Sequence, residues 1–172
     1  MMVKGITYIE NWILNSDQLF HHFITNINWD ERMTARKTAS YGVAYNYSQI
    51  SYPDQEFIPE LKTIIASIEE ELGFTPNNCL LNYYLDGKSS MGFHSDQTDI
   101  LYENTGVVII SLGETRTLRF RRINAKEVTK DYLLTSGSLF YMTDAVQEEW
   151  QHAIPKTNTD LGRISLTFRK IK

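Results

Sequence analysis

The spacing of apolar residues in the first half of the chain predicts two amphipathic helices. After Ser16, which can cap the first helix, an apolar stripe with intervals of three and four residues runs through Leu19, Phe20, Phe23, Ile24 and Ile27. The second helix is predicted to begin at Pro59 and to end at Gly73, with its apolar stripe between them. Proline favours the first turn of a helix and glycine the position after its end.

After Pro76 the pattern changes to short β-type segments separated by turn residues. Candidate strands cover residues 79–84, 107–112, 115–122, 132–135, 138–142, 150–154 and 163–171. Many short strands at this spacing are typical of a sandwich or a barrel. Upstream, residues 41–52 hold four tyrosines and little aliphatic bulk, which predicts a further strand pair with one aromatic face.

Length and composition indicate one soluble globular domain. The chain has 172 residues, 42% of them hydrophobic and 22% charged, with no apolar run long enough to cross a bilayer. No apolar leader follows the first residues, so we expect a cytoplasmic monomer that does not bind membranes. A single cysteine, Cys79, excludes an internal disulfide and a cysteine-rich metal site. Any metal must therefore be held by His, Asp and Glu.

The net charge of −4 is unevenly spread along the chain. Residues 119–172 carry ten Lys and Arg against six Asp and Glu, whereas the earlier part is acidic. This basic part can face phosphate or a small dianion, or it can simply present a polar strand face to water. Charge alone favours the solvent-exposed face.

Two histidines and one aspartate form a candidate metal site. In a strand, residues two apart project from the same face, so His94 and Asp96 would present an imidazole and a carboxylate together. His152 supplies a third ligand from a later segment. Two His and one carboxylate on one side of an ion form the facial triad of non-haem Fe(II) oxygenases. The adjacent His21 and His22 diverge around a helix and cannot chelate one ion.

The last predicted strand carries candidate anion-binding residues. Arg163, Ser165, Thr167 and Arg169 would share one strand face, with Ile164, Leu166 and Phe168 on the other. The Cα atoms of the two arginines would lie about 20 Å apart, which suits the two ends of a small dicarboxylate when both side chains lean inward. Guanidinium pairs with carboxylate at two points.

Taken in order, these motifs identify a family resemblance. The chain resembles the AlkB-type Fe(II)/2-oxoglutarate dioxygenases from about Arg36 to Arg169. The similarity rests on several separate motifs, namely Asn82-x-Tyr84-x-x-Gly87, Gly92-x-His94-x-Asp96, Ser111-Leu112-Gly113-x-x-Arg116-x-x-x-Phe120, Gly137-Ser138-Leu139, Trp150-Gln151-His152 and Arg163-x-Ser165-x-Thr167-Phe168-Arg169.

The resemblance implies an α+β, mainly β fold: a double-stranded β-helix, or jelly-roll, with two supporting helices and a tyrosine-rich N-terminal lid. We expect a single domain over residues 1–172, with a helix and lid in 1–58 and a support helix and catalytic core in 59–172. By position, His94, Asp96 and His152 would bind Fe(II). The 2-oxoglutarate pocket would comprise Asn82, Tyr84, Arg163, Ser165 and Arg169, with Arg163 on the distal carboxylate.

The same resemblance suggests a nucleotide-recognition segment. Arg36 and Lys37 would contact the nucleic-acid backbone and Tyr41 would stack on a flipped base, although a tyrosine-rich hairpin lying over the jelly-roll is an equal alternative. Two positions depart from the family pattern. Thr98 stands where repair members carry an acidic residue that meets a cationic base, and Ser165 stands where many members have Asn.

These expectations combine into one leading hypothesis and two rivals. The leading one is oxidative demethylation of N-alkylated bases in DNA or RNA with Fe(II), O2 and 2-oxoglutarate, releasing succinate, CO2 and formaldehyde. The second keeps the chemistry but acts on a small metabolite or a protein side chain. The third is a binding module without turnover, against which the intact candidate ligands argue. A positively charged groove leading to the iron would favour the first over the second.

Overall fold

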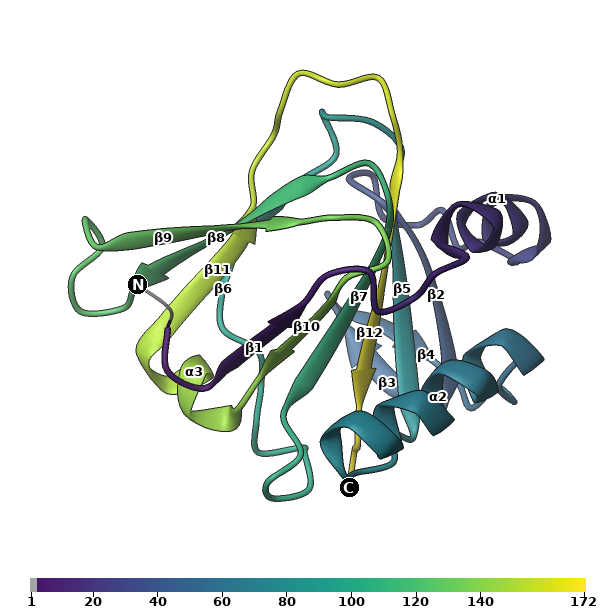
Figure 1. Cartoon of the computed structure of the whole chain (residues 1–172), viewed down its shortest axis with the longest axis horizontal. Coiled ribbons are helices and arrows are strands. Elements are labelled where there is room, and N and C mark those ends of the chain that lie inside the picture. Colours follow the sequence, from purple (N-terminus) through teal and green to yellow (C-terminus); the bar gives the residue numbers. More distant parts are fainter. Residues whose placement is uncertain (1–2) are drawn as a thin grey trace.

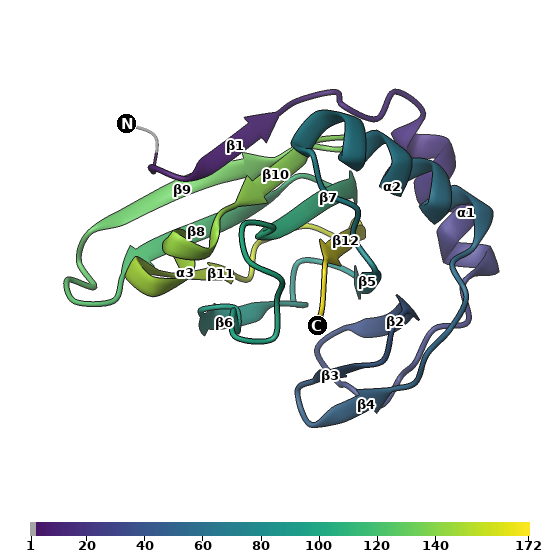
Figure 2. The ribbon, with the colours of Figure 1, turned by 90° about the horizontal axis from the view of Figure 1, so that it is seen from below.

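The computed structural model describes residues 3–172 and contains two facing antiparallel sheets with helices on one side (Figures 1 and 2). The larger sheet has six strands in the order β1-β10-β7-β12-β5-β2, and the smaller has four in the order β6-β11-β8-β9. A separate hairpin pairs β3 with β4. The strands are β1 (Ile6–Ile9), β2 (Lys37–Gly42), β3 (Tyr45–Tyr47), β4 (Ile50–Tyr52), β5 (Asn78–Tyr84), β6 (Met91–His94), β7 (Val107–Gly113), β8 (Arg116–Arg122), β9 (Thr129–Leu134), β10 (Leu139–Met142), β11 (Trp150–Ile154) and β12 (Arg163–Arg169).

Two of the three helices in the described residues cover the outer face of the larger sheet (Figure 2). They are α1 (Ser16–Asn26) and α2 (Pro59–Leu72). The predicted ends of α2 are confirmed: Pro59 lies in its first turn, and Gly73 ends it with φ +82° while donating its N–H to the Glu69 carbonyl. For α1 the predicted cap is wrong. Ser16 is its first helical residue, and Asn15 occupies the cap position without a side-chain hydrogen bond.

The sheets and helices enclose two apolar clusters. One lies between the larger sheet and the helices and includes Phe23, Ile68 and Leu166. The other lies between the two sheets and includes Phe120, Phe140 and Trp150. Because β12 is central in the larger sheet, one of its faces packs under the helices and the other faces the smaller sheet. The candidate site is lined by residues of both sheets.

The jelly-roll architecture predicted from the sequence is confirmed, with four elements added. The candidate strands did not include β1, β2 or β6, and the short helix α3 (Asp144–Glu149) was not predicted. Each has six residues or fewer, too few for a helical or alternating pattern to emerge. Both β1 and β2, from the first 58 residues, are outer strands of the larger sheet. None of the helices in residues 3–172 is long and apolar enough to span a membrane.

Candidate metal and co-substrate site

The floor of the site is the inner face of β12 and its neighbour β5. Ile164, Leu166 and Phe168 lie in the cluster under the helices, so Arg163, Ser165 and Arg169 point between the sheets, as the alternation of β12 predicts. All seven residues of the strand are buried. The sequence had therefore identified a strand with two covered faces, one apolar and one polar.

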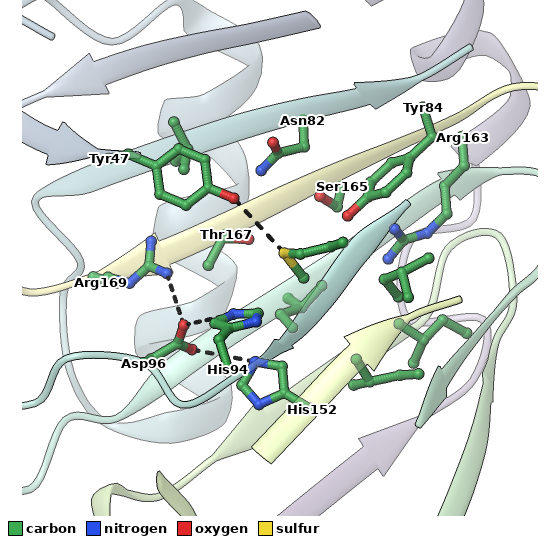
Figure 3. A pocket seen from close by; sticks show the side chains of 16 residues that line it. Tyr47, Asn82, Tyr84, His94, Asp96, His152, Arg163, Ser165, Thr167 and Arg169 are labelled. Carbon is green, nitrogen blue, oxygen red and sulfur yellow. Dashed lines mark hydrogen bonds and ion pairs between the residues drawn. The ribbon is translucent and has the colours of Figure 1, made fainter. Parts of the chain in front are cut away.

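The register between β12 and β5 brings the predicted co-substrate residues together. Ser165 pairs with Asn82, and Arg163 pairs with Tyr84. Paired residues on adjacent strands project from the same face, so all four side chains line one pocket (Figure 3). These pairs lie about 80 positions apart in the sequence, and they meet here because β5 and β12 are neighbours in the larger sheet.

Arg163 is a buried cation that does not use all of its N–H groups in hydrogen bonds with the described residues. Its side chain is only 1% exposed, and its Nη2 donates to the Ser111 hydroxyl at 2.9 Å. Its guanidinium carbon lies 5.1 Å from the centre of the Tyr84 ring. The Nε and Nη1 atoms have no partner among the described residues. Burial lowers the pKa of Arg163, as expected for a guanidinium that lacks an anion at close range.

The three candidate metal ligands meet at the opposite end of the pocket (Figure 3). Strands β6 and β11 pair so that His94 lies directly across from His152. The Nε2 atoms of the two imidazoles lie 3.4 and 3.7 Å from the two carboxylate oxygens of Asp96. One potential ligand atom from each side chain lies within 4.8 Å of the others. This grouping is the arrangement that one ion bound by three side chains requires.

The route by which Asp96 reaches the site differs from the prediction. A continuous strand does not place His94 and Asp96 side by side, because β6 ends at His94 and residues 95–98 have no regular structure. The Ser95 hydroxyl instead donates to the Trp150 carbonyl at 2.8 Å. The Asp96 N–H donates to the Gln147 side-chain oxygen, also at 2.8 Å. Asp96 is therefore held by contacts with the segment that leads into β11.

The protonation of the triad suits metal coordination. His94 Nδ1 lies 2.9 Å from the Gly92 carbonyl, so an Nδ1–H donor leaves Nε2 free to bind a metal. Burial opposes ionisation of Asp96, but the neighbouring His152, His94 and Arg169 hold the pKa of this carboxyl well below its usual range. Burial lowers the pKa of His152 to about 4, which leaves its ring neutral near pH 7. Asp96 and His152 thus offer lone pairs. Burial opposes ionisation of His94, but its contact with Asp96 raises the pKa of His94, so a metal at its Nε2 would have to displace a proton.

Arg169 joins the co-substrate end to the metal end. Its Nη2 lies 3.6 Å from an Asp96 carboxylate oxygen, and its guanidinium lies 5.1 Å from the Tyr45 ring centre. Its Nη1 is buried without a partner in the part of the chain that the structure describes. A second carboxylate placed beside the triad would meet this free donor.

The structure places Arg36 inside the pocket wall and not on the surface predicted for a backbone contact. It is 6% exposed, and its Nε donates to Asn82 Oδ1 at 3.0 Å. Its two terminal nitrogens donate to the Tyr47 hydroxyl, at 2.8 Å, and to the Ser90 carbonyl. A buried guanidinium with three such partners has little freedom to reach a phosphate. Arg36 connects β3 to the co-substrate pocket.

Tyr41 is buried on the helix-covered face of the larger sheet, where it cannot stack on a base in the pocket. It pairs with Cys79 across β2 and β5, and both side chains point to the helix-covered face of the larger sheet. Tyr41 is 5% exposed within that core. An aromatic side chain of the pocket lining comes instead from the tyrosine hairpin, which we define as β3 and β4. There Tyr45 and Tyr47 stack with their ring centres 6.3 Å apart, and Tyr47 lines the pocket.

Thr98 lies in the irregular segment after Asp96. It is half-buried and is not among the residues that line the pocket, and the neighbouring Asp99 is exposed. Sequence reasoning gave no individual role to three residues that shape the site: Ser111 bonds Arg163, Tyr47 bonds Arg36, and Gln147 bonds Asp96. Ser111 belongs to a family-like motif, but only the strand register reveals its partner.

Comparison with known proteins identifies the family. Residues 11–169 match the 2OG-Fe(II) oxygenase superfamily. The chain belongs to this superfamily. The resemblance to AlkB-type dioxygenases predicted from the motifs is thereby confirmed, and membership implies iron, 2-oxoglutarate and O2.

Relatives within the superfamily include alpha-ketoglutarate-dependent dioxygenase alkB homolog 3 of Rattus norvegicus, with 32% identity over 91% of this chain and 60% of that protein. The Homo sapiens protein of the same name is 31% identical over 92% of this chain and 63% of its own length. DNA oxidative demethylase ALKBH2 of Bos taurus is 30% identical over 79% of this chain and 53% of that protein. The chain thus spans about three fifths of the length of its alkB homolog 3 relatives.

The solved structure of OsALKBH1 has the same fold. It covers 99% of this chain and 100% of its own, with a TM-score of 0.66 and 16% sequence identity. The side chains of the described pocket also fit the superfamily's requirements. Two imidazoles and a carboxylate form the donor set preferred by non-haem Fe(II), and two buried guanidiniums with free N–H groups suit a dicarboxylate.

Proposed function

We propose that this protein oxidatively demethylates N-alkylated bases in DNA or RNA, with Fe(II), O2 and 2-oxoglutarate. The observation that carries the proposal is the pocket that joins a His-Asp-His triad to two buried arginines, each with at least one nitrogen that lacks a partner in the described residues. The names of the relatives support the same chemistry: one is a DNA oxidative demethylase, and others are alpha-ketoglutarate-dependent dioxygenases.

In this proposal one end of the pocket binds the metal and the other end binds the distal carboxylate of 2-oxoglutarate. His94, Asp96 and His152 hold the metal, and Arg163 pairs with the distal carboxylate of 2-oxoglutarate, with Ser111 fixing the guanidinium. Asn82, Tyr84 and Ser165 line the space between, and Arg169 faces the metal-bound end of the co-substrate. Bound iron supplies the activation of oxygen, and the protein supplies orientation and a shielded space.

The reaction balances without a further reductant. One atom of O2 enters succinate as 2-oxoglutarate loses CO2, and the other replaces a C–H bond of the N-methyl group by C–OH. The resulting hemiaminal breaks its C–N bond, releasing formaldehyde and the unmodified base. The chain's own residues need only place the methyl carbon beside the triad. This requirement calls for a base removed from the helical stack.

The tyrosine hairpin is our candidate for holding such a base. Tyr45 and Tyr47 are half-buried and their rings lie at an interplanar angle of 17°. Tyr47 lines the pocket, and the Tyr45 ring centre lies 5.1 Å from the guanidinium of Arg169, another lining residue. Aromatic side chains that stack on bases tolerate any base identity, so the hairpin selects a nucleobase without selecting its sequence context. Arg36 anchors it through the Tyr47 hydroxyl.

Turnover with defined substrates tests the proposal. We expect 2-oxoglutarate consumption, in the presence of iron, to rise several-fold with oligonucleotides carrying 1-methyladenine or 3-methylcytosine compared with unmodified ones of the same sequence. Methylated nucleosides and methylated peptides at equal concentration test the rival substrates. Stimulation by the nucleosides or peptides alone would contradict the nucleic-acid assignment, and absence of any turnover would favour a binding module.

A further inference from the structure

We propose that Gln147 is a positioning residue of the metal centre, which holds Asp96 in place through its backbone. The inference rests on the proposed metal site and assigns a role to a side chain outside its ligand set. Gln147 lies in α3, is 5% exposed, and accepts the Asp96 N–H on Oε1 at 2.8 Å. This is the only glutamine buried to this extent among the described residues.

Asp96 needs this contact because no strand pairing holds it. The ladder between β6 and β11 ends at His94, and residues 95–98 are irregular. The two histidines are fixed by strand pairing, whereas the carboxylate ligand depends on side-chain contacts of its segment. These contacts are the Gln147 bond and the bond from the Ser95 hydroxyl to the Trp150 carbonyl.

The orientation of the Gln147 amide is determined by its two neighbours. Its Nε2 lies 3.5 Å from the Met142 sulfur, a weak acceptor, while Oε1 faces the Asp96 donor. The reverse orientation would set two N–H donors against each other. Met142 is fully buried at the end of β10, so the amide is held from both sides.

Because Gln147 lies close to His152 in the chain, its bond to Asp96 links two of the candidate metal ligands. It lies five residues before His152, on the helix that leads directly into β11. Asp96 is thereby tied to the same segment that supplies His152, and the spacing of these two ligands is set by that bond. Hydrogen bonds that orient ligands from outside the coordination shell commonly affect metal affinity by ten- to a hundredfold.

Metal binding by the purified protein tests the role independently of any nucleic acid. Titration of the metal-free protein with Mn(II) should show that Gln147→Leu raises the dissociation constant about tenfold or more. Gln151→Leu is the matched control, because Gln151 lies next to His152 but bonds Arg121 on the outer face of β11. It should bind Mn(II) like the wild type.

Comparison with His94→Ala distinguishes an error in the positioning role of Gln147 from an error in the metal site itself. If His94→Ala lowers Mn(II) affinity and a folded Gln147→Leu does not, the positioning role is wrong while the metal site stands. If His94→Ala leaves the affinity unchanged, the metal site itself fails. If Gln147→Leu does not fold, amide hydrogen exchange of the wild type tests whether the Gln147 side chain holds the Asp96 N–H. The Asp96 amide should exchange at least tenfold more slowly than the Gln97 amide, and equal exchange would overturn the proposal.

Discussion

Arg163 illustrates how one residue's surroundings specify its partner. A guanidinium that is 1% exposed, with two nitrogens unpartnered in the described residues, is stable only with an anion beside it. We expect Arg163→Lys to raise the KM for 2-oxoglutarate up to about tenfold, because an ammonium keeps the charge but loses the two-point geometry of a pair worth about 1.5–3 kcal/mol. Initial rates measured over a range of 2-oxoglutarate concentrations give this KM. Arg122→Lys, on the exposed end of β8, is the control, and an unchanged KM in Arg163→Lys would refute the role.

Arg36 makes a second prediction at this scale. Arg36→Lys keeps the charge but loses the fork that bonds Asn82, Ser90 and Tyr47 together. Tyr47→Phe removes only one of these bonds. The arginine variant should therefore show both faster hydrogen exchange in residues 45–52 and weaker 2-oxoglutarate binding, whereas Tyr47→Phe should show mainly the first. Calorimetric titration with 2-oxoglutarate gives the second quantity. Wild-type exchange and affinity in Arg36→Lys would contradict the connecting role.

At the scale of elements, the tyrosine hairpin is the test of the substrate proposal. Tyr45→Ala should lower kcat/KM for a methylated oligonucleotide roughly five- to 150-fold, which corresponds to about 1–3 kcal/mol of lost stacking. Turnover of 2-oxoglutarate without substrate should persist. Tyr102→Ala removes a tyrosine that is 46% exposed and lies outside the pocket lining, and it should leave both rates unchanged. Equal effects of the two substitutions would remove the hairpin from substrate binding.

The turn between β2 and β3 depends on a glycine. Gly42 has φ +86°, and a Cβ there would lie 2.1 Å from the Asn77 carbonyl oxygen. Gly73 has a similar φ of +82° with no atom within 4 Å of such a Cβ. Urea unfolding should show Gly73→Ala losing about 1–2 kcal/mol from backbone strain, and Gly42→Ala losing more because the clash adds to the strain. Equal losses would mean that the turn relaxes freely.

How far the sequence predicts an element depends on how far it repeats a pattern. In β12 seven residues alternate, so its start, both faces and its arginines were predictable, whereas the predicted strand continued two residues beyond Arg169. The ends of α2 follow from Pro59 and Gly73. The four short elements β1, β2, β6 and α3 show no clear periodic pattern, and Asp96 lies beyond a strand end where alternation no longer applies. The face of Tyr41 depends on its pairing with Cys79, which no local pattern contains.

At the scale of the whole molecule, the site exists because two sheets contribute different chemistry. The smaller sheet supplies His94 and His152 from adjacent strands, and the larger sheet supplies Arg163 and Arg169 from its centre. In the proposed function, metal and co-substrate would meet between these two sheets, with one apolar cluster between the sheets and the other under the helices. Tyr47 of the tyrosine hairpin lines the same pocket (Figure 3), and there we propose that the substrate base binds.

The most direct test of this account is the simultaneous measurement of formaldehyde and succinate from one methylated oligonucleotide. With iron and 2-oxoglutarate present, we expect the wild type to release the two products in a ratio near one, with the unmodified base recovered by mass spectrometry. His94→Ala should release neither. Succinate formed without formaldehyde from every alkylated DNA and RNA oligonucleotide tested, or formaldehyde released equally by His94→Ala, would contradict the account.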